Sequence, residues 1–230
     1  MVGAGEDPRG GVRRLRGALA ALVTGIAATL VVIALAILPF LNPVWVAFGQ
    51  ERAESAAWTG FGPEDLRAVT DAVLADLVIG PPDFDVSLDG APVLNERERE
   101  HMRDVRKVFS SFFVAAIAGL VILVGAWVLA RGPAARARFW HRLAVTGVAI
   151  AVGTVVVGVA GVALFDAAFE VFHRLFFPAG TYLFDPRTER LVQLFPQQFW
   201  VESTIGVGAV VIALGLGLAW IARRRVAADR

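Results

Sequence analysis

The sequence contains no cysteine and is poor in the side chains that most enzymes use. It has three histidines, one tyrosine and, as Lys107, a single lysine among 22 basic residues. The absence of cysteine excludes structural disulfides, a thiol nucleophile and lipidation of the chain itself. No GxSxG nucleophile elbow, phosphate-cradling glycine loop or HExxH zinc motif occurs either. We therefore expect no cofactor, no metal and no nucleic-acid partner.

Charge is missing from four stretches of the chain. Each is close to the about 20 residues that a helix needs to cross the hydrocarbon core of a bilayer. They cover residues 17–38, 108–130, 143–165 and 203–222. Hydrophobic residues make up 57% of the chain, more than the roughly half found in globular proteins. The sequence therefore predicts an all-α membrane protein with a four-transmembrane-helix bundle, whose last span begins near residue 201.

Arginines predict the orientation of this bundle. They are concentrated before span one, between spans two and three and after span four, and the only acids beside them are Glu6, Asp7 and Asp229. Because positive residues in short loops stay on the cytoplasmic side, both termini are predicted to be cytoplasmic. The first span is longer than a signal-peptide h-region and meets LPFLNP rather than a small-residue cleavage site, so we expect a retained anchor.

The two remaining loops, residues 39–107 and 166–200, then lie outside the cell membrane. With the spans they are expected to form one integral membrane domain over residues 1–230. Since the spans contain no buried acid or base, the features of a proton relay, an ion-coupled transporter or a charged pore are missing. Any chemistry is therefore expected in the outer loops.

These loops predict an extracytoplasmic cap of short helices and a β-hairpin. A helix is expected after Pro63, with one apolar face formed by Leu66, Val69, Val73 and Leu77. An Asp-Gly turn at residues 89–90, between short apolar pieces, indicates the hairpin. Asn95 and Glu98 form a capping-box pattern that opens a helix running into span two. A second hairpin is expected around the turn-like residues 185–188.

Two histidines lie in these loops, close to the ends of spans. His101 precedes span two and has Asp104 three residues on, while His173 follows span three and has Glu170 three residues before it. A carboxylate at this spacing can fix the tautomer of an imidazole. If the two loops fold over each other, both rings meet at the depth of lipid ester groups. The alternative is two unrelated, solvated histidines.

Three further polar residues follow His173. Arg174 and Tyr182 are candidate donors to a developing oxyanion or to a headgroup phosphate, although a tyrosine at this depth is more often an interfacial anchor. Asp185 opens the expected turn. These residues either touch a substrate or brace the loop.

Four linked motifs identify a family. LNPVW after span one, HMRDVRKVF before span two, FHRLFFPAGTYLFDP after span three and LVQLFPQQFW before span four occur in this order. Together they resemble the lipoprotein intramolecular transacylase family, Lit, over residues 17–222. The motifs are specific as a set rather than singly.

This resemblance implies an acyltransferase at the outer leaflet of the bacterial cytoplasmic membrane. The family moves the sn-2 acyl chain of a diacylglyceryl lipoprotein onto the α-amine of its N-terminal cysteine, which gives a lyso-form lipoprotein. Its two functional histidines match His101 and His173 by motif context. The implied partners are a diacylated lipoprotein and membrane lipids, and ester-to-amide conversion needs no cofactor. The alternative is a non-enzymatic membrane scaffold that binds a lipid or a partner protein through its outer cap.

Overall fold

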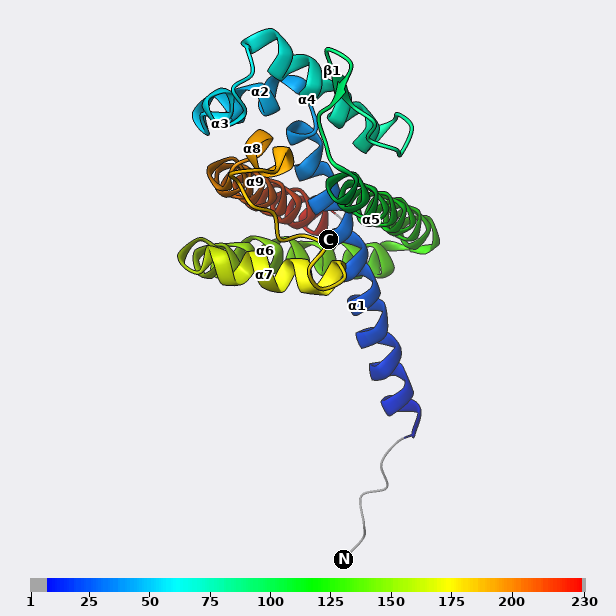
Figure 1. The fold of residues 1–230 in the computed structure, drawn as a ribbon. Coiled ribbons are helices and arrows are strands. Elements are labelled where there is room, and N and C mark those ends of the chain that lie inside the picture. The colour runs from blue at the N-terminus through cyan, green and yellow to red at the C-terminus, as the bar shows by residue number, and fades with distance from the viewer. Residues whose placement is uncertain (1–7, 229–230) are drawn as a thin grey trace, which may run out of the picture.

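Four long helices dominate the structure, a computed structural model that describes residues 8–228 (Figure 1). They are α1 (Pro8–Ile37), α5 (Glu96–Leu129), α6 (Pro133–Ala163) and α9 (Gln197–Ala228). Each is long and apolar enough to cross a membrane, which confirms the predicted all-α membrane fold. Four charged residues used to predict orientation lie outside the described residues: Glu6, Asp7, Asp229 and Arg230.

Helix α5 extends well beyond its apolar part. Its 34 residues correspond to about 51 Å at 1.5 Å per residue, whereas a hydrocarbon core is about 30 Å thick. The uncharged part, residues 108–129, is the membrane-crossing segment, and the charged turns before it project into the cap. The predicted capping box opens the helix, because the Asn95 side chain accepts the Glu98 N–H at 3.0 Å and Glu98 accepts the Asn95 N–H at 2.7 Å. This projection carries His101 into the cap.

The long helices pack as two pairs, α6 with α9 and α1 with α5, and α1 also contacts α6 and α9. Glycines allow the closest approach. A Cβ on Gly215 would lie 2.9 Å from the Gly147 carbonyl oxygen, and one on Gly147 would lie 2.8 Å from the Ala219 nitrogen. Small residues at such positions let membrane helices pack backbone to backbone.

The cap is built from both loops, and its first-loop elements lie together at the top of Figure 1. Its elements are the 3-10 helix η1 (Leu38–Phe40), α2 (Pro43–Arg52), α3 (Ser55–Thr59), α4 (Pro63–Val78), strands β1 (Ser87–Leu88) and β2 (Ala91–Pro92), α7 (Phe165–Phe176) and α8 (Arg190–Leu194). The strands pair antiparallel around Asp89 and Gly90, both at positive φ, so the first predicted hairpin is confirmed.

One apolar core joins the two loops. Leu66, Val69 and Val73 of α4 are buried, as their spacing predicted. They pack in one cluster with Leu191 and Leu194 from the second loop. The apolar stripe of α4 therefore packs on the second loop rather than on the membrane surface, and the two loops are folded over each other.

The prediction of a second hairpin around residues 185–188 is wrong. The turn forms, with the Thr188 N–H donating to the Asp185 carbonyl at 3.0 Å, but residues 190–194 are the helix α8 and the described residues 181–195 contain no strand. Leu191 and Leu194, three residues apart, both face the cap core only in a helix. Tertiary packing thus overrides an apolar run that is too short to indicate a strand by itself.

Labelling of single cysteines in this cysteine-free chain tests the orientation. In intact cells, a membrane-impermeant maleimide should label Glu64→Cys in the cap. It should label Arg138→Cys only after permeabilisation, because arginine-rich ends stay cytoplasmic. Both positions are exposed to solvent or headgroups. The reverse labelling pattern would place the cap in the cytoplasm and contradict the prediction.

The glycine contact between α6 and α9 predicts a position-specific loss of stability. Gly147→Ala should lower the free energy of unfolding by about 1–3 kcal/mol, since the new methyl group meets backbone atoms of α9. Gly153→Ala is the matched control on the same helix, because nothing lies within 4 Å of its added Cβ. Thermal unfolding in detergent measures both, and equal midpoints for the two variants would refute the close packing.

Candidate active site

His101 and His173 lie side by side in the cap. Their ring centroids are 6.1 Å apart and their planes are inclined by 22°. His101 comes from the projecting part of α5 and His173 from α7, which follows the third span. The loops that carry them share the cap core, so residues far apart in the sequence are brought together. Both candidate histidines therefore belong to one site.

Aromatic side chains enclose the two imidazoles. The ring centroids of Phe177 and Phe184 lie 4.9 and 5.4 Å from that of His101. The ring centroids of Phe169 and Tyr182 lie 3.8 and 4.9 Å from that of His173. Phe177 contacts both rings, at 5.5 Å from His173. His101 is only 6% exposed and His173 is half-buried. Exclusion of water by this box favours neutral imidazoles, because a charged ring would lose its hydration.

The backbone of α7 fixes the tautomer of His173. Its Nδ1 lies 2.7 Å from the Phe169 carbonyl oxygen, which can only accept, so Nδ1 carries the proton. Nε2 is left with a free lone pair. Burial lowers the pKa of His173 below its ordinary 6.5, opposed by the Phe169 carbonyl and by the charge of Glu170. His173 is thus presented as a neutral ring with one basic nitrogen.

Glu170 has a different role from the one its spacing suggested. It accepts hydrogen bonds from the Arg174 Nε at 2.7 Å and from the Tyr182 hydroxyl at 3.2 Å, not from His173. Tyr182 is 5% exposed, and its ring lies against His173. The three residues form a chain that ties the following loop to α7 beside the imidazole.

The ring of His101 is held without a carboxylate. Asp104 accepts a hydrogen bond from Lys107 at 2.9 Å and none from His101. Nδ1 of His101 is buried and has no hydrogen-bond partner among the described residues. Since buried polar atoms are nearly always paired, this nitrogen is an exception among the described residues.

Asp185 organises the turn after Tyr182. Its carboxylate accepts the Arg187 N–H at 3.0 Å, and its own N–H donates to Glu189 at 2.6 Å. It contacts neither imidazole through a hydrogen bond. Of the candidate supporting residues, Glu170, Arg174 and Tyr182 therefore lie on the His173 side of the site, whereas Asp104 and Asp185 shape its surroundings.

Sequence reasoning missed the aromatic box and the residues that hold it. Phe177 and Phe184 have no motif beyond a phenylalanine-rich stretch around His173. Glu98 was recognised only as a cap, yet its second oxygen accepts the Leu191 N–H at 2.7 Å across 93 residues. This contact joins the two loops, so no local sequence pattern could have predicted it.

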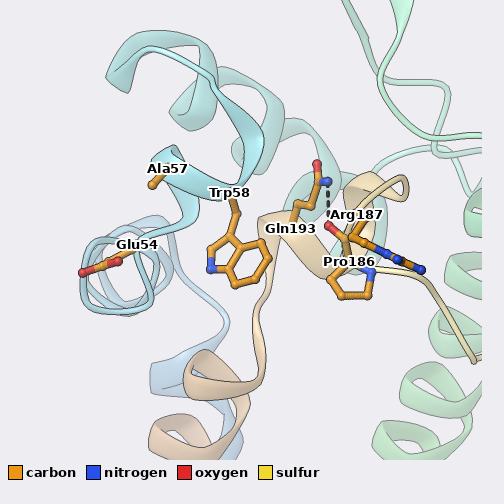
Figure 2. A pocket seen from close by; sticks show the side chains of 6 residues that line it. All are labelled: Glu54, Ala57, Trp58, Pro186, Arg187 and Gln193. Carbon is orange, nitrogen blue, oxygen red and sulfur yellow. Dashed lines mark hydrogen bonds between the residues drawn. The ribbon is translucent and has the colours of Figure 1, made fainter.

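The described surface pockets lie elsewhere. Figure 2 shows one between α3 and the second loop, where Trp58 faces Pro186 and Arg187 and the Gln193 amide donates to the Pro186 carbonyl at 2.8 Å. A second is lined by α4 and the hairpin. Neither includes a histidine. Within residues 8–228, no three histidine or carboxylate side chains gather closely enough to hold a metal ion.

Comparison with known proteins finds one family. The model of the family "Lipoprotein intramolecular transacylase Lit" matches residues 22–200. An uncharacterized protein of Aquifex aeolicus is 23% identical over 129 residues, a match that spans 56% of each chain. The chain thus covers about half the length of that curated relative.

Solved structures of Lit from Bacillus cereus have the same fold. One is 16% identical with a TM-score of 0.70 and covers 94% of this chain and 98% of its own. Another, in which one histidine is replaced by arginine, has a TM-score of 0.72 and covers 97% and 99%. A third carries alanine at that histidine, again with a TM-score of 0.72. At this identity the likeness shows the shared fold.

The lowered pKa of His173 predicts a pH-dependent stability. The unfolded chain keeps the ordinary value near 6.5, so the folded protein binds this proton less readily. The free energy of unfolding should therefore fall as the pH drops from about 8 to about 5, and the fall should be smaller in His173→Gln. Histidine-selective NMR should show a resonance, absent from the variant, that titrates below 6.5. Identical stability profiles for parent and variant would contradict this.

Proposed function

The chain belongs to the lipoprotein intramolecular transacylase family, and from this premise we propose that it relocates an acyl chain within a lipoprotein. The sn-2 acyl group of the diacylglyceryl moiety moves to the α-amine of the N-terminal cysteine, which leaves a lyso-form lipoprotein. The observation that carries this proposal is the pair of imidazoles with ring centroids 6.1 Å apart inside an aromatic box.

A base is the first requirement of this reaction. An α-amine has a pKa of about 8, so at neutral pH most of it is protonated and cannot attack an ester. Nε2 of His173 has a free lone pair, because the Phe169 carbonyl holds the proton on Nδ1. We assign His173 as the general base that takes a proton from the amine.

Two protons leave the nitrogen during the reaction. The first passes from the ammonium to His173 and on to solvent, which frees the amine to attack. As the amine nitrogen bonds to the carbonyl carbon, the bond between that carbon and the sn-2 oxygen breaks, and the oxygen takes up the second nitrogen proton, relayed by His173. His101 lies beside His173, with ring centroids 6.1 Å apart, and assists at this oxygen. An ester and an ammonium group thus become an amide and an alcohol, one proton is released to solvent, and no electrons are gained or lost.

Orientation of one substrate molecule supplies much of the catalysis. Amine and ester belong to the same lipidated residue, so folding the headgroup until they touch replaces a collision between two molecules. Apolar residues exposed on α7 fit a helix that lies in the membrane interface: Val171, Phe172, Leu175 and Phe176. Such a placement brings His173 to the depth of lipid esters.

The proposed location is the outer leaflet of the bacterial cytoplasmic membrane. Arg131, Arg136 and Arg142 lie at the end of the bundle opposite to the cap, where α5 meets α6. Since positively charged loops stay cytoplasmic, the cap and both histidines face outward and both termini lie inside. A diacylated lipoprotein reaches this site within the plane of the membrane.

Mass spectrometry of N-terminal lipopeptides tests the proposal. In a host that cannot itself acylate the N-terminus, expression of the chain should relocate one acyl group to the amine while the total mass stays unchanged. His101→Gln and His173→Gln should each reduce conversion by about 100-fold or more, since positioned general bases contribute 10²–10⁴-fold. The matched control is His141→Gln, an exposed histidine on α6 at the opposite end of the bundle, which should leave conversion intact.

Three outcomes would count against the proposal. Identical lipopeptide fragments with and without the chain would exclude the transfer. Transfer that survives both histidine substitutions would exclude the assigned chemistry, and a cellular function that survives them without any transfer would favour a membrane scaffold.

A further inference from the structure

Glu98 is a fully buried carboxylate one turn before His101. The residue is only 1% exposed. One oxygen accepts the N–H of Asn95, at the start of its own helix, at 2.7 Å. The other accepts the N–H of Leu191, at the start of α8, at 2.7 Å. A single carboxylate therefore fastens α5 to the second loop.

The segment that it fastens covers both histidines. Residues 177–191 run from the end of α7 to α8 and will be called the strap. The strap supplies Phe177 and Phe184 against the His101 ring and Tyr182 against the His173 ring. One of its ends continues from the helix that carries His173, and the other is held on the helix that carries His101.

The neighbouring residue Arg97 fastens the same strap at its outer side. It forms an ion pair with Glu189, and its guanidinium lies 4.8 Å from the centroid of the Phe184 ring. Glu189 also accepts the Asp185 N–H at 2.6 Å. This ion pair is half exposed on the arginine side and is screened by solvent, whereas the Glu98 link is buried.

Loss of the Glu98 carboxylate leaves the strap without its inner attachment. The N–H groups of Leu191 and Asn95 would then be buried and unpaired, which costs more than the hydrogen bonds themselves are worth. At the strap, this cost is relieved when the Leu191 N–H moves toward water. Such a movement displaces Phe177, Tyr182 and Phe184 from the rings that they enclose.

We propose that Glu98 is a positioning residue for the transacylase: by holding the strap on α5 it sets the spacing of His101 and His173. This inference rests on the proposed function for its kinetic part only. The carboxylate hydrogen-bonds to backbone and to neither imidazole, so it acts through the strap and not on the substrate.

Kinetics of three variants test the positioning role. Glu98→Ala should lower kcat about tenfold to hundredfold with little change in KM, since the lost charged hydrogen bonds hold the rings and not the acyl chain. Glu98→Gln keeps one acceptor and should show a smaller loss. Glu96→Ala is the matched control, because Glu96 is exposed and its ion-pair partners among residues 8–228 are Arg99 and Arg103, neither of which belongs to the strap.

A distance measurement makes the inference independent of activity. The chain has no cysteine, so spin labels can be placed at Glu100→Cys on α5 and at the exposed Leu183→Cys on the strap. Their distance distribution should be narrow in the parent and in Glu96→Ala, and broad in Glu98→Ala. A cooperative thermal unfolding transition verifies that each variant is folded. If Glu98→Ala does not fold, Glu98→Gln is measured in its place.

Each outcome decides one part. Unchanged kcat and an unchanged distance distribution in both Glu98 variants would overturn the positioning role, and so would a change in KM alone. If the parent transfers no acyl group but the distance broadens in the variants, the transacylase proposal fails and the attachment of the strap by Glu98 stands.

Discussion

The apolar core shared by the two cap loops is the constraint on which the site depends. The first loop contributes α4 and the hairpin, and the second contributes Leu191 and Leu194, which are buried among them. Two membrane spans separate these loops in the sequence. Because the second loop can bury its leucines only there, α7 is drawn over the start of α5 and His173 comes to His101. Packing in the cap thus creates the pair of imidazoles.

Burial of so short a helix requires partners for its backbone. Helix α8 has five residues, too few to satisfy its own terminal groups. The carboxylate of Glu98 accepts the Leu191 N–H at one end, and at the other end Gln50 and Ser55 donate to the Leu194 carbonyl at 2.9 and 3.0 Å. Side chains from α2, α3 and α5 therefore hold one element of the second loop, which gives the strap a fixed anchor.

Local patterns predicted what local chemistry determines. Charge-free windows predicted the four spans, and the Asp-Gly turn predicted the first hairpin. The capping-box pair Asn95 and Glu98 predicted the start of α5. The predicted strand at residues 190–194 is a helix, because burial of Leu191 and Leu194 against α4 decides the structure there and leaves no local signal. The sequence also suggested Asp104 and Glu170 as partners of the histidines. In the structure Asp104 instead accepts a hydrogen bond from Lys107, and Glu170 accepts hydrogen bonds from Arg174 and Tyr182. The proximity of the two imidazoles depends on contacts across the whole cap. The sequence alone therefore left two possibilities open, a shared site and two unrelated histidines.

The aromatic box suits the base of the proposed reaction, which must both take and return a proton. A pKa below the ordinary value keeps the His173 ring neutral at neutral pH, so it is ready to accept. In the proposed reaction, the same burial makes the imidazolium costly, so His173 would release the proton readily to the sn-2 oxygen. A strongly basic residue in this place would keep the proton. Enclosure by phenylalanines, which looks like a packing feature, therefore has a chemical consequence: it matches the proposed base to the proposed reaction, in which one proton leaves an amine and arrives at an oxygen of the same molecule.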